Sequence, residues 1–176
     1  QEATPLFYAI DHSDGKIAKL LLEKGADPNI CDFNRRIPLH YAVRFEYEPM
    51  CKLLLQYKSD PNIQDIYGNT PLHDACEFQN EKIANLLLLK DADLSKVNKE
   101  GKMPIDIAKD KKDETMEKLL LAAYLEEEQG LPRGSFTRYL GNQFGKRRSR
   151  KSNRRRKRSK RSKRSKRLRR IHKKKN

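Results

Sequence analysis

The apolar residues of this chain recur at an interval of 33 positions. Leucine triplets begin at Leu20, Leu53, Leu86 and Leu119, and two further series keep the same register without an insertion. These two series are Pro5, Pro38, Pro71 and Pro104, and Ala9, Ala42, Ala75 and Ala108. Self-similarity at such a period is typical of repeat proteins, in which each period is one small structural unit. The pattern therefore predicts four consecutive units of the same kind.

Within each unit, the pattern predicts two short helices followed by a turn. The sequence Thr-Pro-Leu starts at Thr4 and again at Thr70. It is typical of a helix start, because the Thr hydroxyl can cap free backbone N–H groups and Pro needs no donor at the first helical position. Further along the unit, the apolar residues at 83–87 have the spacing of an amphipathic helix. The Gly-Ala-Asp-Pro-Asn sequence at 25–29 predicts that the second helix ends there and that the chain turns outward.

Units of this length with these motifs resemble ankyrin repeats from residue 1 to about residue 124. The resemblance implies an all-α fold, an ankyrin-repeat solenoid of stacked helix-turn-helix units with β-hairpin fingers, which binds a protein partner on its concave face. The residues alone favour stacking too, because one such unit cannot bury its apolar face by itself. We assign the domain to residues 1–125, with repeats at about 1–32, 33–65, 66–98 and 99–125.

Five positions depart from the repeat pattern. Ile37 and Met103 stand where Thr is expected at the helix start, and we expect each to lose about 1 kcal/mol of capping energy. Arg35, Lys58 and Asp91 stand where other units have Gly. We expect these three residues to adopt a left-handed backbone at some cost, because only Gly adopts that conformation freely.

Charge divides the chain into two parts of opposite sign. Residues 146–176 hold 21 Lys and Arg and no acidic residue, whereas residues 1–145 hold 19 basic and 24 acidic residues, a net charge of −5. The last 31 residues have too little apolar content to offset the entropy of ordering, and we expect a disordered basic C-terminal tail there. Residues 126–145 are expected to be a linker or a short motif that folds on a partner.

No residue pattern indicates catalysis, a metal or a cofactor, so we expect a protein that is not an enzyme. Cys31, Cys51 and Cys76 are odd in number and form no C-x-x-C pair, which argues against a disulfide framework and a structural zinc site. His40 and His73 share one repeat position and are expected to be structural, bonding to neighbouring loops. The longest apolar run is too short to span a membrane. Because no polar cap precedes the first unit, we expect further residues upstream.

The resemblance also implies which residues face a partner, namely those at the hairpin tips and at the ends of the first helices. These are Phe33, Asn34, Arg36, Arg44 and Phe45 in the second unit, Ile66, Tyr67, Asn69, Glu77 and Phe78 in the third, and Lys99, Glu100, Lys102, Asp110 and Lys111 in the fourth. Aromatic and Arg side chains are enriched among the residues that dominate interface energies. The two central units are therefore the predicted protein-binding site.

The basic clusters of the tail resemble nuclear localisation signals. The candidate residues for contact with an import receptor, or with RNA or DNA phosphates, are Arg154, Arg155, Arg156, Lys157, Arg158, Lys160, Arg161, Lys163 and Arg164. We therefore expect an adaptor or inhibitor located in the nucleus, with no membrane or small-molecule ligand. Two alternatives stay open. One is a regulatory protein whose tail binds nucleic acid, and the other is an ankyrin effector or substrate-recognition subunit.

Overall fold

The computed structural model describes residues 4–132 and 134, so the candidate residues of the basic tail lie outside the described residues. The described part contains helices and no strand. The helices are α1 (Pro5–Asp11), α2 (Gly15–Glu23), α3 (Pro38–Arg44), α4 (Glu48–Gln56), α5 (Pro71–Glu77), α6 (Glu81–Leu88), α7 (Pro104–Asp110) and α8 (Glu114–Glu128). The last helix thus continues three residues beyond the predicted end of the repeats at 125.

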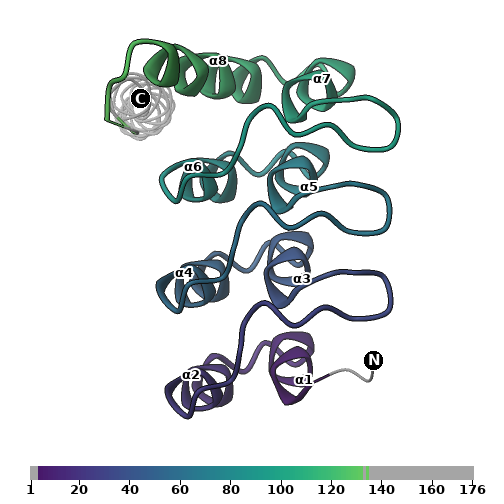
Figure 1. Ribbon diagram of the computed structural model, residues 1–176, viewed down its shortest axis with the longest axis vertical. Helices are drawn as coiled ribbons and strands as arrows, with labels where there is room; N and C mark the ends of the chain where they lie inside the picture. Colours follow the sequence, from purple (N-terminus) through teal and green to yellow (C-terminus); the bar gives the residue numbers. More distant parts are fainter. Residues whose placement is uncertain (1–3, 133, 135–176) are drawn as a thin grey trace, which may run out of the picture. The chain divides into compact units, whose positions relative to one another are not determined.

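The helices form antiparallel pairs that stack in one direction (Figure 1). The first helices, α1, α3, α5 and α7, lie in one column, and the second helices, α2, α4, α6 and α8, lie in a parallel column. Each helix packs on its partner in the pair and on the equivalent helix of the next unit. The buried side chains form one continuous apolar cluster along the stack. The predicted all-α ankyrin-repeat solenoid is confirmed.

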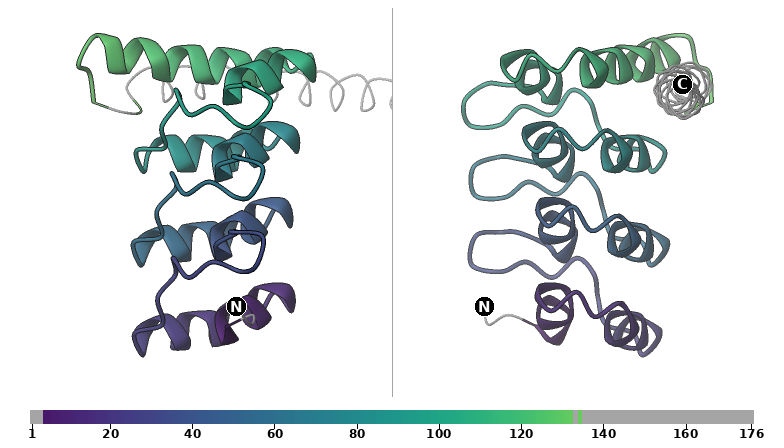
Figure 2. Two further views of the ribbon diagram at one scale, coloured as in Figure 1. Left: turned by 45° about the vertical axis from the view of Figure 1, so that its right-hand side comes forward. Right: turned by 180° about the vertical axis from the view of Figure 1, so that it is seen from behind.

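Long loops project beyond the column of first helices, one between each pair and the next (Figure 2). We call these loops the fingers. The resemblance implies β-hairpins, but in each finger two backbone bonds close a tight turn. In the second finger they run from the Asp65 N–H to the Asn69 carbonyl and from the Gly68 N–H to the Asp65 carbonyl, both at 2.9 Å. The Asp65 carboxylate also accepts the N–H groups of Tyr67 and Asn69. Adjacent fingers are joined through the backbone, from Ile66 N–H to the Asn34 carbonyl at 2.9 Å.

The helix starts of the second and third units are capped differently from the sequence prediction. The backbone N–H of Ile37 donates to Nδ1 of His40 at 3.3 Å, and that of Thr70 donates to Nδ1 of His73 at 3.1 Å. The Thr70 hydroxyl lies 2.8 Å from the same ring nitrogen instead of capping the backbone. Ile37 makes no side-chain cap, as predicted, but Thr70 makes none either, so the third unit gains no capping bond from its Thr.

In the fourth unit Met103 likewise makes no side-chain cap, and its own N–H donates to the Asp106 carboxylate at 3.0 Å. The left-handed backbone predicted at three non-Gly residues is confirmed, with φ of 57° at Arg35, 65° at Lys58 and 60° at Asp91. Both findings follow from the stack. Each unit keeps the same backbone path, and the neighbouring groups hold it there even where the local residue is unfavourable.

None of the described helices is long and apolar enough to cross a membrane.

Candidate protein-binding site

Four exposed aromatic side chains lie at the finger tips and at the ends of the first helices. Phe33 and Tyr67 lie at finger tips and are 78% and 56% exposed. Phe45 and Phe78 follow the last residues of α3 and α5 and are 48% and 36% exposed. We call the surface formed by these four residues the finger face. Ile66, which was predicted with them, is half-buried in its finger.

Two predicted Arg residues connect adjacent units on this face. The Arg36 side chain lies with its Cζ 6.0 Å from the ring centroid of Tyr67, and its Nε is 3.2 Å from the carboxylate of Asp65. The Asp65 side chain is fully buried, so this ion pair is shielded from water on one side. The guanidinium of Arg36 thus holds the next finger and its ring in one position.

The second Arg makes an equivalent arrangement at the helix ends. The Cζ of Arg44 lies 5.4 Å from the ring centroid of Phe78, and its Nη1 lies 3.5 Å from the Asp74 carboxylate. Asp74 is buried, and its Oδ2 has no hydrogen-bond partner in the described part of the chain. Burial raises the pKa of Asp74 to about 7, although the positive charge of Arg44 acts against this rise.

The other predicted residues of the central units are bound within the chain. Asn69 accepts a bond from the Asn98 amide at 3.0 Å through its own side-chain oxygen. Glu77 forms an ion pair with Lys111 of the next unit. Asn34 uses its carbonyl to join the next finger. These three residues therefore stabilise the stack, whereas the four aromatic rings of the finger face stay exposed.

The fourth unit presents charged groups in place of rings. Lys102 forms ion pairs with Glu100 at 3.1 Å and with Asp110 at 3.0 Å. Lys99 is exposed. Exposed pairs of this kind contribute little free energy, because water and salt screen them. The apolar part of the finger face therefore ends at the third unit.

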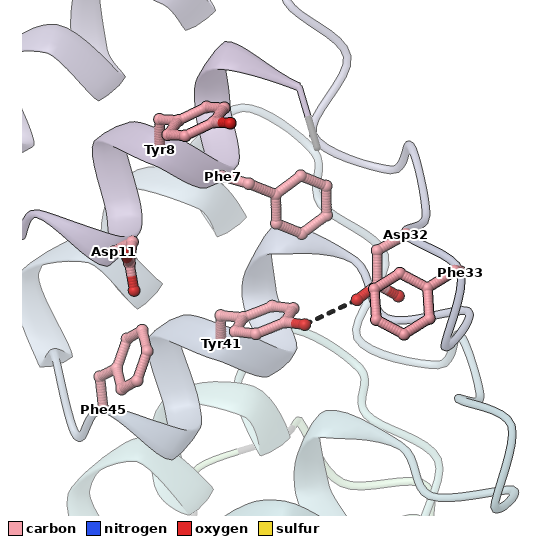
Figure 3. Close-up of a pocket in the computed structure, with 7 residues that line it drawn as sticks. All are labelled: Phe7, Tyr8, Asp11, Asp32, Phe33, Tyr41 and Phe45. Atoms are coloured by element: carbon pink, nitrogen blue, oxygen red, sulfur yellow. Dashed lines mark hydrogen bonds between the residues drawn. The ribbon is translucent and has the colours of Figure 1, made fainter. Parts of the chain in front are cut away.

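A pocket of about 220 Å³ lies at the other end of the finger face, between the first two units (Figure 3). It is lined by Phe7, Tyr8, Asp11, Asp32, Phe33, Tyr41 and Phe45. The rings of Phe7 and Tyr41 meet edge to face, with centroids 5.5 Å apart. The Tyr41 hydroxyl donates to the Asp32 carboxylate at 2.6 Å, and this bond fixes the ring against the finger.

The sequence prediction included Phe33 and Phe45 but missed the rest of this pocket. Phe7 stands at the repeat position that holds His40 and His73 in the next two units. This replacement was visible in the sequence, and it marks the first unit as different. Tyr41 was not identifiable in this way, because its role depends on the bond to Asp32 across a turn.

The predicted structural role of the two His residues is confirmed. Nε2 of His40 lies 3.1 Å from the Asn69 carbonyl, and Nε2 of His73 lies 3.1 Å from the Lys102 carbonyl. Because Nδ1 of each ring accepts a backbone N–H, each Nε2 carries the proton and donates it to the next finger. Burial lowers the pKa of His40 to about 4 and also lowers the pKa of His73. Each neutral ring thus joins two units.

Nothing in the described residues resembles a metal centre, since no cluster of His, Cys, Asp or Glu with a suitable arrangement occurs among them. The three Cys residues are free thiols, and burial raises the pKa of Cys51 to about 12. A thiol with such a pKa is protonated near neutral pH and is a poor nucleophile.

Comparison with known families gives one match. A family described as Ankyrin repeats (3 copies) matches residues 6–99 and again residues 39–129. A search of curated proteins found no match to this chain. The two family matches overlap and together include all four helix pairs except the first residue of α1.

Proposed function

We propose that this chain, which belongs to the ankyrin-repeat family, is an adaptor or inhibitor that binds a partner protein on its finger face. Ankyrin repeats are in general non-enzymatic modules that bind other proteins. The partner would be held by the exposed rings of the second and third repeats. The basic tail would then direct the complex to the nucleus.

The exposure of Tyr67 and Phe78 is the observation that supports this function best. Both rings are more than one-third exposed beside the continuous buried core of the stack. Each ring has an Arg side chain over one face, which fixes its orientation before a partner arrives. Preorganised aromatic and Arg groups lose little side-chain entropy on binding, and such groups dominate interface energies.

Replacement of both rings tests the function. We expect the Tyr67→Ala, Phe78→Ala double variant to lose partner capture from a cell extract while its circular dichroism spectrum stays unchanged, because neither ring is buried. Tyr124→Ala is the matched control, since Tyr124 is a similarly exposed ring at 51% on α8, away from the fingers. Capture by the double variant equal to that of the control would contradict the proposed site.

Nuclear targeting is the second part of the proposal and rests on the charge of residues 146–176. The cluster from Arg154 to Arg158 and the following Lys-Arg pairs have the composition that acidic grooves of import receptors recognise. A fluorescent fusion that ends at residue 145 is expected to leave the nucleus. If it remains as nuclear as the full chain, the tail is not the targeting element.

The same charge supports a second candidate function, which is electrostatic binding of RNA or DNA by the tail. Each phosphate contact would release counterions, so the affinity should fall steeply as salt increases. The tail has no aromatic residue between its charges, which argues against base stacking and sequence readout. A salt titration of nucleic-acid binding, with and without residues 146–176, distinguishes the candidates. No affinity near physiological salt would eliminate this one.

A further inference from the structure

The interface between the second and third repeats shows how this fold holds a cation. There the guanidinium of Arg44 lies over the ring of Phe78, with Cζ 5.4 Å from the centroid. The positions 33 residues earlier are Asp11 in place of Arg44 and Phe45 in place of Phe78. The pocket between the first and second repeats thus keeps the ring, as Phe45, but has the carboxylate of Asp11 where the next interface has the guanidinium of Arg44.

The first repeat also lacks the equivalent of the second Arg, Arg36. Arg36 binds the carboxylate of Asp65 in the next finger, whereas the residue 33 positions before Arg36 is Ala3. The carboxylate equivalent to that of Asp65 belongs to Asp32. Its Oδ2 accepts a hydrogen bond from the Tyr41 hydroxyl, where Asp65 has its ion pair with Arg36. That hydroxyl is neutral, and it also interacts with Arg36, whose ion pair is with Asp65 of the next finger.

The pocket of about 220 Å³ described above includes three of these positions, namely Asp11, Asp32 and Phe45. Aromatic rings and the carboxylates of Asp11 and Asp32 line it, and no Lys, Arg or His is among its lining residues in the described part of the chain. Asp11 is exposed at the end of α1 and points toward the ring of Phe45 in Figure 3. The pocket is below the range of about 300–1,000 Å³ typical of small-molecule sites, so it is sized for one amino-acid side chain.

We propose that this pocket receives an Arg side chain of the partner protein, whose guanidinium lies over Phe45 as Arg44 lies over Phe78. This inference rests on the proposed function of the finger face. An Arg fits better than a Lys, because a planar guanidinium stacks on rings while it donates hydrogen bonds to a carboxylate in its own plane. Asp11 and Asp32 complement its charge, so an acidic segment of a partner would be repelled.

Defined small probes test the site without knowledge of the partner. The full chain, labelled with ¹⁵N, is titrated with N-acetyl-arginine methylamide and with the corresponding citrulline derivative, which has nearly the same shape but no charge. We expect saturable shifts of the amides of Phe7, Tyr41 and Phe45, with Arg binding about two to five times more tightly than citrulline, the range expected for a cation over exposed rings. Equal binding of both probes would show an apolar pocket and overturn the proposal.

Variants of the full chain provide the second arm of the test. Asp11→Arg places the chain's own guanidinium at the position equivalent to Arg44, and we expect it to abolish binding of the Arg probe. Glu23→Arg is the matched control, because it makes the same charge change on α2, outside the pocket. Phe45→Leu should weaken binding of the Arg probe. Phe78→Leu, at the same position of the next repeat, should leave that binding unchanged.

Two results contradict the proposal directly. Retained Arg binding by the Asp11→Arg variant would show that the cation does not lie over Phe45. The absence of saturable shifts with either probe would also overturn it, whether the pocket stays empty or the chain's own tail fills it. If the Arg probe does not bind, the capture experiment on Tyr67 and Phe78 is unaffected, since neither ring lines this pocket. The failure of this site and the failure of the proposed function are therefore distinguishable.

Discussion

Replacement of His40 by Gln should change how the stability of the stack depends on pH. His40 is fully buried, accepts the Ile37 N–H and donates to the Asn69 carbonyl of the next finger. Burial lowers its pKa to about 4, below the value of 6.5 that is usual for an exposed His. Protonation in the folded state would remove the acceptor at Nδ1, so the fold requires the neutral ring.

The sign of the effect follows from proton binding. Between pH 6.5 and 4 the unfolded chain binds the His40 proton and the folded chain does not, so acidification favours unfolding. For this pKa difference, the contribution of His40 lost between pH 7 and pH 5 is about 2 kcal/mol. His73 acts in the same direction, because burial lowers its pKa too.

Urea unfolding, followed by circular dichroism at pH 7 and at pH 5, measures this contribution. A Gln side chain can accept and donate similar bonds but does not titrate in this range. We therefore expect His40→Gln to lose about 2 kcal/mol less stability than the unaltered chain between the two pH values. Parallel losses in the two proteins would refute the reasoning, because they would show that His40 does not titrate differently in the folded state.

Three further substitutions test other parts of the fold. As the pH falls from 7 to 5, the folded chain gains about 2 kcal/mol of stability at Asp74, because burial raises its pKa to about 7 and the folded state binds the proton first. Asp74→Asn should remove this gain, which the same urea series measures, and an unchanged pH dependence would contradict the raised pKa. Gly68→Ala should lower the melting temperature through a loss of about 1 kcal/mol or more of folding stability, because φ is +78° and the new Cβ would lie 3.0 Å from the backbone of Asn98. An equal melting temperature would argue against this backbone conformation and close contact. Lys58→Gly should raise the urea midpoint through a gain of up to about 1 kcal/mol, because φ there is 65°; a lower midpoint would show that no strain is stored there.

The repeat period predicted most of the fold, because every unit must present the same faces to its neighbours. The left-handed backbone at Lys58 and Asp91 was predictable, since Gly25 marks this position in the first unit. The left-handed residues between the two helices of a unit, such as Glu46 and Gln79 with φ of 53° and 54°, were not predicted. No Gly stands there in any unit, so the local sequence did not indicate the turn.

The candidate site was predicted less completely than the fold. Tyr67 and Phe78 could be found from their repeat positions alone, and the structure places both on the finger face. The pocket between the first two repeats is lined by residues of α1, of a finger and of α3 with its C-terminal end, so its shape depends on packing between units. The bond that His40 accepts from the Ile37 N–H was missed, because residue propensities do not contain it, whereas the bond of its ring to the next finger was expected from the repeat position.

Hydrogen exchange of the full chain, with and without its captured partner, tests most directly whether the finger face binds protein. We predict that the partner slows exchange in the fingers at residues 33–36 and 66–69 and at the C-terminal ends of α3 and α5, while α4 and α6 exchange as before. Protection confined to the second helices, with fingers that exchange at the free rate, would contradict the account.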